Sequence, residues 1–161
     1  MGSDGGILGD RGLAIMSGLH RWLISVTGGR VGWRIGRMPT VELHTTGRRS
    51  GRPRSAILSA PILEPDRIVL VASKGGADHH PAWYLNLVAD PDVEVGLRGS
   101  VRRMRARTAT RDERAALWPR ITAAYPGYAR YQQRTRREIP VVVCEPRSQG
   151  PSVPGEAAAP A

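Results

Sequence analysis

The pattern of apolar and polar residues in the stretch 41–63 predicts two β-strands joined by a polar turn. Residues alternate in character through the first half, which is typical of a strand with two distinct faces. Gly47 and Gly51 bracket the turn, and 56–63 continues in an extended pattern. Pro53 excludes a central ladder position just after the turn. The residues that share one side of the first strand are Val41, Leu43 and Thr45.

Further short strands follow, joined by hairpins or separated by short helices. The Gly-Ser pair at 99–100 is typical of a two-residue hairpin turn. This order favours an α+β, mainly β, fold in which an antiparallel sheet closes toward a barrel, rather than a doubly wound parallel sheet. The expected strands after the first two span 67–73, 92–98, 101–109 and 139–144.

Two regions carry the start and stop signals of helices. Pro81 begins the first, and the Asp-Pro pair at 90–91 ends it. Thr110 and Glu113 have the Thr-x-x-Glu form of a capping box, which starts the second. We expect two prolines to divide this second region into short helical pieces, because an interior proline removes a hydrogen bond. These prolines are Pro119 and Pro126.

Three tyrosines recur at every third residue in the second helical region. Tyr125, Tyr128 and Tyr131 are three of the four tyrosines of a chain that has no phenylalanine. Such spacing is typical of a core stripe. A buried hydroxyl needs a partner, however, and three hydroxyls close together suit the wall of a ligand pocket. The spacing leaves both interpretations open.

Composition divides the chain into three parts. Residues 1–28 form an opening segment in which 13–26 carries apolar residues at helical spacing, and 29–147 holds the strands and helices of one domain. Residues 148–161 have the composition of a disordered tail. The opening segment is too short and too polar to span a bilayer. We expect it to pack on the domain, to be disordered, or to make a peripheral membrane contact through residues 13–37.

Basic residues outnumber acidic ones, and nearly all of them are arginine. The 161 residues carry 24 Lys and Arg against 14 Asp and Glu, a net charge of +10, and Lys74 is the one lysine. Such a chain attracts polyanions, which include nucleic acid, anionic lipid and phosphorylated or polycarboxylate small molecules. The single cysteine, Cys144, excludes an internal disulfide and fits a reducing cytoplasm. We interpret it as a core thiol, because no base lies near it in sequence.

Two groups of arginines are candidates for binding an anion. The first lies in the turn after Thr46, where glycines allow backbone N–H groups to converge, so the turn is either an anion cradle or an ordinary basic hairpin tip. The second lies along one face of the strand at 101–109, as a solvated face or a polyanion track. The turn arginines are Arg48, Arg49, Arg52 and Arg54, and the strand arginines are Arg103, Arg105 and Arg107.

Several familiar chemistries lack their motifs. The chain has no Walker turn, no Gly-x-Gly-x-x-Gly after a strand and no Gly-x-Ser-x-Gly elbow. His79 and His80 are adjacent and lack the usual spacing of metal ligands, so we expect no metal site. What remains suits chemistry carried by a bound cofactor, for which the protein supplies placement and electrostatics.

Four motifs in order resemble the deazaflavin-dependent nitroreductase family of actinobacteria, over a region from about Gly29 to Arg147. The family is a split β-barrel that binds the 8-hydroxy-5-deazaflavin coenzyme F-420, whose side chain carries a phosphate and a poly-γ-glutamate tail. Two residues depart from the family pattern: Lys74 replaces a frequent glutamine, and His80 a frequent asparagine. The motifs are TGRRSGRPR at 46–54, ASKGG at 72–76, PAWYLNL at 81–87 and IPV at 139–141.

The resemblance implies a location for each part of the coenzyme. The acidic arm would bind at the turn, and the deazaflavin ring would lie at the end of the strand at 67–73 and the start of the following helix. Ser73 and the three tyrosines would shape the substrate side and orient the acceptor. The implied residues for the arm are Arg48, Arg49, Ser50, Gly51, Arg52 and Arg54. Those for the ring are Ala72, Ser73, Lys74, Trp83, Tyr84 and Asn86.

The resemblance also implies an activity, which is hydride transfer from reduced coenzyme F-420 to an electron-poor acceptor such as a quinone, enone or nitro compound. Two alternatives stay open. One is a split-barrel oxidoreductase that uses flavin mononucleotide (FMN). The other is a non-enzymatic binder of polyanions or membrane surfaces, although the strand arginines lack the interleaved aromatics that stack nucleic-acid bases. We expect no nucleic-acid partner, and a cytoplasmic protein that could associate with the inner face of the membrane.

Overall fold

The computed structural model describes residues 34–35 and 38–147. The predicted opening helix at 13–26 and the tail at 148–161 lie outside these residues. The strands are β1 Arg34–Ile35, β2 Met38–Thr46, β3 Pro53–Ser59, β4 Ile62–Leu63, β5 Ile68–Val71, β6 Asp92–Leu97, β7 Ser100–Thr108 and β8 Val141–Pro146. The helices are the 3-10 turn η1 Lys74–Gly76, α2 Ala82–Ala89, α3 Arg111–Ala124 and α4 Gly127–Arg134.

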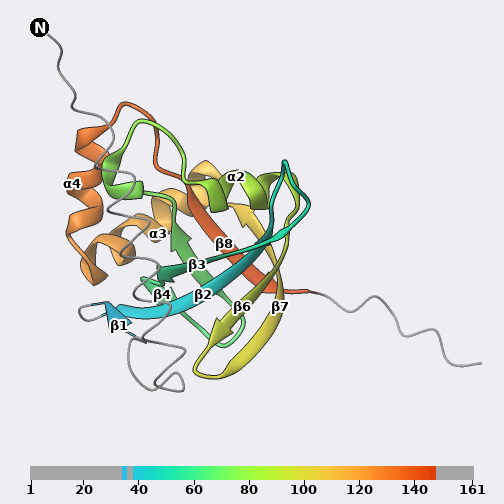
Figure 1. The fold of residues 1–161 in the computed structure, drawn as a ribbon. Coiled ribbons are helices and arrows are strands. Elements are labelled where there is room, and N and C mark those ends of the chain that lie inside the picture. The colour runs from blue at the N-terminus through green and yellow to red at the C-terminus, as the bar shows by residue number, and fades with distance from the viewer. Residues whose placement is uncertain (1–33, 36–37, 148–161) are drawn as a thin grey trace, which may run out of the picture.

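All strand pairs are antiparallel, and the sheet curls into a barrel-like body (Figure 1). The strands follow the order β1-β2-β6-β7-β8-β5-β4, and β3 pairs with β2 outside this path. β3 also contacts β5, which brings the two ends of the sheet near each other without a ladder between them. The prediction of a mainly β, antiparallel split barrel flanked by short helices is therefore confirmed.

Two hydrophobic clusters lie on opposite faces of β5 and β8. Ile68 and Leu70 of β5 belong to the barrel interior, which α2 covers through Leu87. Val69 and Val71, the alternate residues of the same strand, belong to a second cluster under α3 and α4. Because β5 is buried on both faces, its C-terminal end is held firmly, and this end leads directly into the loop that carries Ser73.

Several boundaries differ from the sequence prediction. The strand predicted at 67–73 is shorter, since β5 ends at Val71. Pro119 lies inside α3, which continues unbroken, because the proline is exposed while Leu117 and Ile121 bury the opposite side of the helix. The stretch 56–63 is not one strand, since the ladder ends at Ser59 and β4 pairs with β5 instead. The last strand begins two residues later than expected, at Val141.

The hairpin between β6 and β7 also turns one residue earlier than predicted. Leu97 pairs with Ser100, so the turn residues are Arg98 and Gly99, with φ of 49° and 84°. Positive φ at both central residues is the geometry that matches the twist of the flanking strands. Arg98 therefore occupies a left-handed conformation that its side chain disfavours. The turn residues are at 98–99, one position before the predicted Gly-Ser pair at 99–100.

Candidate functional site

A hollow of about 410 Å³ lies between the turn after β2 and the start of α2. It combines guanidinium groups from the turn with apolar and amide groups from the helix. The predicted site residues that line it are Arg48, Arg49, Ser50, Arg54, Trp83 and Asn86, joined by Thr45, Gly47, Ser55, Ala56 and Ala82. Six of the residues implied by the family resemblance are therefore brought together around one concave surface.

The turn itself is a tightly bonded unit. Gly51 has a φ of 64°, a conformation that side chains disfavour. A Cβ at Gly47 would lie 2.8 Å from the Ser50 hydroxyl oxygen, so a larger residue would be crowded there. The N–H groups of Gly47, Ser50 and Gly51 all donate to carbonyls within the turn. Because these donors are already used, the anion-binding groups that the turn offers are guanidinium groups and not the predicted cluster of backbone N–H groups.

Asn86 fastens the turn to α2. Its side chain is buried, its Oδ1 accepts from the N–H of Arg48 at 3.2 Å, and its Nδ2 donates to the Thr45 hydroxyl at 3.3 Å. The amide is thus committed to bonds within the protein, which fix where the Arg48 backbone lies. Asn86 lines the hollow as an anchor for the turn.

The turn arginines differ from the strand arginines in how their charges are balanced. Within the described residues, none of the four turn arginines forms an ion pair. The three strand arginines that share one face of β7 are each paired with a carboxylate: Arg103 with Glu94, Arg105 with Asp92, and Arg107 with Glu113 and Glu145. Arg102, the fourth arginine of β7, donates to the carbonyl of Pro65 instead. The β7 row is therefore a solvated and neutralised face, and positive charge is left available at the turn.

The predicted floor of the ring site lies at the exit of β5. Ala72 is fully buried, its N–H donates to Pro140 and its carbonyl accepts from Arg137, so it lies behind the surface. Ser73 is 9% exposed. Lys74 follows with a φ of 45°, and its Nζ lies 2.5 Å from Nε2 of His79. A non-glycine residue in this conformation is strained, which is a feature that functional loops often show.

The three tyrosines form one cluster. The ring centroids of Tyr125 and Tyr128 are 5.5 Å apart, and Tyr131 lies 6.2 Å from each. The cluster packs on the core under α3 and α4, and α4 contacts η1, next to Ser73 (Figure 1). Spacing alone could not choose between a core stripe and a pocket wall; the cluster belongs to the core and also borders the loop.

The hydroxyls of Tyr128 and Tyr131 are held in their protonated form. Burial, followed by the neighbouring tyrosines, raises the pKa of Tyr128 to about 12. Hydrogen bonding with Tyr125 and burial raise the pKa of Tyr131. At neutral pH both groups are therefore hydrogen-bond donors and not bases.

Trp83 and Tyr84 take different places on α2. Trp83 lines the hollow, and its ring meets Tyr84 edge-on with centroids 6.2 Å apart. Tyr84 points toward the sheet, where its hydroxyl lies 2.9 Å from that of Thr108. Tyr84 therefore packs toward the sheet, while Trp83 lines the hollow and also packs against the barrel interior.

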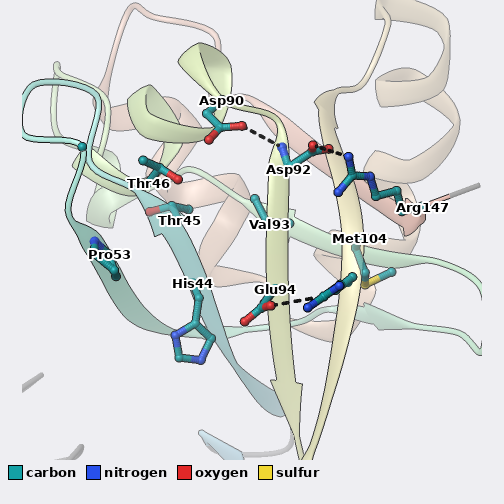
Figure 2. Close-up of a pocket in the computed structure, with 12 residues that line it drawn as sticks. His44, Thr45, Thr46, Pro53, Asp90, Asp92, Val93, Glu94, Met104 and Arg147 are labelled. Carbon is teal, nitrogen blue, oxygen red and sulfur yellow. Dashed lines mark hydrogen bonds and ion pairs between the residues drawn. The ribbon is translucent and has the colours of Figure 1, made fainter. Parts of the chain in front are cut away.

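A second hollow, of about 360 Å³, lies on the other side of the β2 end and was not predicted (Figure 2). Its carboxylates come mostly from β6, and two of them are paired: Asp92 with Arg147 at 3.0 Å and Glu94 with Arg103 at 3.6 Å. Asp90 adds a further carboxylate, bonded to the N–H of Asp92. Its charges are therefore largely paired within the protein, unlike those of the hollow at the turn.

Sequence reasoning also missed Arg137, which binds the loop after β5 from the opposite side. Its guanidinium donates to the carbonyls of Ala72, Ser73 and Ala77. No local pattern signals this role, because the partners lie far away in the sequence.

Two further sequence predictions can be placed. Cys144 is a buried free thiol of the barrel interior, and burial raises its pKa to about 12, which confirms a core role. His79 and His80 belong to no group of three or more candidate metal ligands among residues 34–35 and 38–147. No helix in the described part of the chain has the length and apolar character needed to cross a membrane.

The fold and the hollow define the class, a split barrel with an arginine-lined site suited to an anionic cofactor. A family model described as F420H(2)-dependent quinone reductase matches residues 17–146. The match begins inside the opening segment, earlier than the region of resemblance seen in the sequence. The chain belongs to the F420H(2)-dependent quinone reductase family, which confirms the predicted class of enzyme, a coenzyme F-420-dependent oxidoreductase.

Individual relatives agree with this assignment. The F420H(2)-dependent quinone reductase of Mycobacterium tuberculosis is 39% identical over 129 residues, which cover 78% of this chain and 86% of the relative. A solved structure described as an F420-H2-dependent reductase, FDR-A, is 41% identical, has a TM-score of 0.61 and covers 66% of this chain and 94% of its own. Another, described as a domain-swapped dimer, is 36% identical with a TM-score of 0.62, covering 78% and 98%.

Proposed function

We propose that the protein transfers a hydride from reduced coenzyme F-420 to a quinone. The observation that carries the proposal is the hollow between the turn and α2, which is lined by Trp83 and by arginines that form no ion pair with any other described residue. The family supports the coenzyme, and the activity for which the M. tuberculosis relative is named supports a quinone as acceptor. Enones and nitro compounds remain candidate acceptors, since they accept a hydride by the same chemistry.

The residues of the turn fit the acidic arm of the coenzyme. Arg48, Arg49 and Arg54 line the hollow and can form charge-assisted hydrogen bonds with a phosphate and with carboxylates. Ser50 adds a hydroxyl, whereas Gly51 gives the turn its shape. Arg52, outside the lining, would act through its charge alone. The arginines of the second hollow are already paired with carboxylates, so the arm should lie along the turn and not across β6.

The ring would lie between the exit of β5 and the first turn of α2. Trp83 lines the hollow and would supply an apolar surface, whereas Ser73 and Lys74 lie outside its lining and would supply polar groups from the exit of β5. When bound in its reduced form, the coenzyme supplies a hydride from C5 of its ring. Ala72 supports this surface from behind, because it is buried and its backbone groups are bonded within the protein.

The contribution of the chain is to place and polarise the acceptor. Tyr128 and Tyr131 keep their protons at neutral pH, so their hydroxyls can donate a hydrogen bond to an acceptor oxygen that gains negative charge. Ser73 can orient the same oxygen from the floor. The tyrosine cluster borders the loop after β5, and in this proposal it would exclude water from that side of the ring. The proton that completes the reduction comes from water or from one of these hydroxyls.

A fluorescence titration tests the proposal. Purified protein is titrated against coenzyme F-420, and menadione is then added to the reduced complex. We expect saturable binding followed by oxidation of the coenzyme. Arg49→Met and Arg54→Met should each weaken binding by about tenfold to a hundredfold, since hydrogen bonds to charged groups contribute about 1.5–3 kcal/mol.

Arg111→Met is the matched control, because Arg111 is exposed at the start of α3, away from the turn. Its affinity for the coenzyme should equal that of the wild type. Absence of binding by the wild type, or equal loss in all three variants, would remove the turn from the site. An absorption spectrum of the purified protein distinguishes the FMN alternative, because a bound flavin absorbs differently.

The cytoplasmic location and the peripheral membrane contact through residues 13–37 stay predictions. The support for the contact is chemical, since quinones are often apolar and a basic, amphipathic segment favours anionic lipid surfaces. Sedimentation of the full chain with anionic and with neutral vesicles tests it. Binding to neither would leave the enzyme to meet its acceptor in solution.

A further inference from the structure

Arg137 lies in the connection between α4 and β8 and reaches across to the loop that follows β5. Its Nη2 donates to the carbonyls of Ala72 at 3.1 Å and Ser73 at 3.0 Å, and its Nε donates to the carbonyl of Ala77 at 2.7 Å. Its Nη1 lies 3.2 Å from Nδ1 of His80. One side chain therefore holds both ends of the loop that contains η1.

The backbone of Arg137 is itself fixed to α4. Its carbonyl accepts from Nε2 of Gln132 at 2.8 Å, and Oε1 of Gln132 accepts from the N–H of Ile139 at 2.8 Å. Arg114 of α3 donates to the same Oε1 at 3.0 Å. Gln132 is the neighbour of Tyr131 in sequence, so the network runs from the tyrosine helix through Arg137 to the backbone of Ser73.

The chemistry of these contacts explains why an arginine stands here. Within the described residues Arg137 has no carboxylate at ion-pair distance, and burial lowers its pKa while leaving the group charged. Its partners are neutral carbonyls, which a planar fork of donors can bind at the same time. His80 must present an unprotonated Nδ1 to this donor, and the burial and positive charge that lower its pKa favour that form.

We propose that Arg137 is a positioning residue for hydride transfer: it sets the place of Ser73 and Lys74 relative to the tyrosines of α4. The proposal rests on the proposed function. Because Arg137 binds the rear of the loop and the turn arginines bind the arm, loss of Arg137 should affect turnover far more than coenzyme affinity. Misplacement of a reactive group by about 1 Å can cost about a hundredfold in rate.

The test compares Arg137→Ala and Arg137→Lys with Arg136→Ala, an exposed neighbour for which the described residues offer no hydrogen-bond or ion-pair partner. Amide hydrogen exchange of residues 72–80 is measured without coenzyme, and coenzyme affinity and kcat with menadione are measured separately. For Arg137→Ala we expect faster exchange at 72–80, a coenzyme Kd within about threefold of the wild type and a kcat at least about tenfold lower. Added guanidinium at low concentration should restore part of that rate.

Each other outcome overturns the inference. Exchange and kcat equal to those of Arg136→Ala would show that Arg137 positions nothing. A large loss of coenzyme affinity with kcat retained at saturation would make Arg137 a ligand of the coenzyme instead. If Arg137→Ala does not fold, the kcat of Arg137→Lys provides the test, because lysine keeps the charge but lacks the several N–H donors of the guanidinium. An unchanged kcat in that variant contradicts the proposal.

Failure of the proposed function gives a different result. Wild-type protein that binds no coenzyme and reduces no quinone counts against the function itself. Wild-type activity with an unaffected Arg137→Ala rate counts against Arg137 alone. The exchange measurement needs no coenzyme, so it separates a loop that Arg137 holds from one that it does not.

Discussion

The phenolic groups of α4 combine an apolar setting with a donor that persists over a wide pH range. Tyr128 is 6% exposed, and burial, followed by the neighbouring Tyr131 and Tyr125, raises its pKa to about 12. A raised pKa means that the neutral, donating form survives to higher pH than for a tyrosine in water. A hydroxyl of this kind can stabilise negative charge on an acceptor without being lost by ionisation.

Replacing Tyr128 or Tyr131 with phenylalanine tests the role of the hydroxyl while keeping the ring. We expect the variant that loses an acceptor-binding donor to show a kcat about tenfold to a hundredfold lower with menadione, because removal of one such donor commonly has an effect of this size. Coenzyme affinity, measured by fluorescence, should be unchanged.

The same hydroxyls predict the alkaline side of the pH profile. Because the pKa of Tyr128 is raised to about 12, turnover should show no loss from tyrosine ionisation up to about pH 10. A limb near the ordinary tyrosine pKa would assign the donor role to another group. If both phenylalanine variants kept the wild-type rate with every acceptor, the tyrosine hydroxyls would have no catalytic role and the rings would serve only in packing.

Among the elements, η1 and α4 meet at a glycine. Gly76 has a φ of 86°, and a Cβ there would lie 2.8 Å from the carbonyl oxygen of Tyr131. Gly75 has a φ of 65° with open space around the same position, so it has the strain without the clash. Substituting Gly75 therefore tests the effect of backbone conformation alone, whereas substituting Gly76 also tests the contact with α4.

We expect Gly75→Ala to lower the free energy of unfolding by about 1 kcal/mol, the usual effect of a left-handed residue that gains a Cβ. Gly76→Ala should lose a further 1–3 kcal/mol or so, since the backbone of α4 must move to relieve the clash. Urea unfolding measures both values. Gly76→Ala should also reduce turnover more than Gly75→Ala; equal stability and equal turnover would mean that α4 is not held against η1.

The start of α3 is fixed by a capping box that also carries an ion pair. The Glu113 carboxylate accepts hydrogen bonds from Nη1 and Nη2 of Arg107 at 2.7 and 2.8 Å, and from the N–H of Thr110 at 2.8 Å. The hydrogen bond from Arg107, followed by that from Thr110, lowers the pKa of Glu113 to about 2. A lowered carboxyl pKa stabilises the fold above the ordinary value of about 4.5, and this contribution is lost as the pH falls toward 2.

Glu113→Ala should therefore reduce stability by about 1 kcal/mol at neutral pH, as loss of a capping interaction does. The difference between variant and wild type should shrink as the pH drops from about 5 to about 2, because the wild-type carboxyl becomes protonated. Thermal melts across this range measure it. The side chain is 38% exposed, so the effect will be modest, and a difference that grows in acid would contradict the assignment.

At the scale of the whole molecule, charge is distributed unevenly. The net charge is +10, yet Arg103, Arg105 and Arg107 of β7 are paired with carboxylates, whereas the four turn arginines form no ion pair with any other described residue. Affinity for an acidic coenzyme should therefore depend on ionic strength through the turn. Between about 0.1 and about 1 M salt the screening length falls from about 10 to about 3 Å, and we expect Kd to rise severalfold.

The control for this measurement is Arg49→Met, whose Kd should rise less steeply with salt because one of the screened charges is gone. Double-stranded DNA provides a second comparison, since a neutralised β7 face should bind it weakly. DNA affinity that persists at high salt, without coenzyme binding, would favour the polyanion-binding alternative over the reductase.

Much of the fold could be predicted because its strands are amphipathic and its turns local. Val41 and Leu43 alternate with polar residues since only one face of β2 is buried, and the same holds for β7 around Met104. The errors have local causes. Pro119 would break an isolated helix, but burial of Leu117 and Ile121 keeps α3 intact.

The candidate site was predictable where its residues are neighbours in sequence. The turn arginines form one charged run, so composition and spacing pointed to them. The role of Arg137 was not visible, because it depends on α4 and β8 bringing a distant side chain behind Ser73. The family resemblance named Asn86 as a contact, and its commitment to Arg48 and Thr45 emerged from side-chain geometry alone.

Cys144 gives the protein a built-in reporter of barrel opening. It is the single thiol of the chain, fully buried between β5 and β7, with a pKa that burial raises to about 12. A maleimide or disulfide reagent can reach it only when those strands separate, since the folded thiol is neither accessible nor ionised. The labelling rate of the unmodified protein would thus report how often these strands separate, and no engineered probe would be needed.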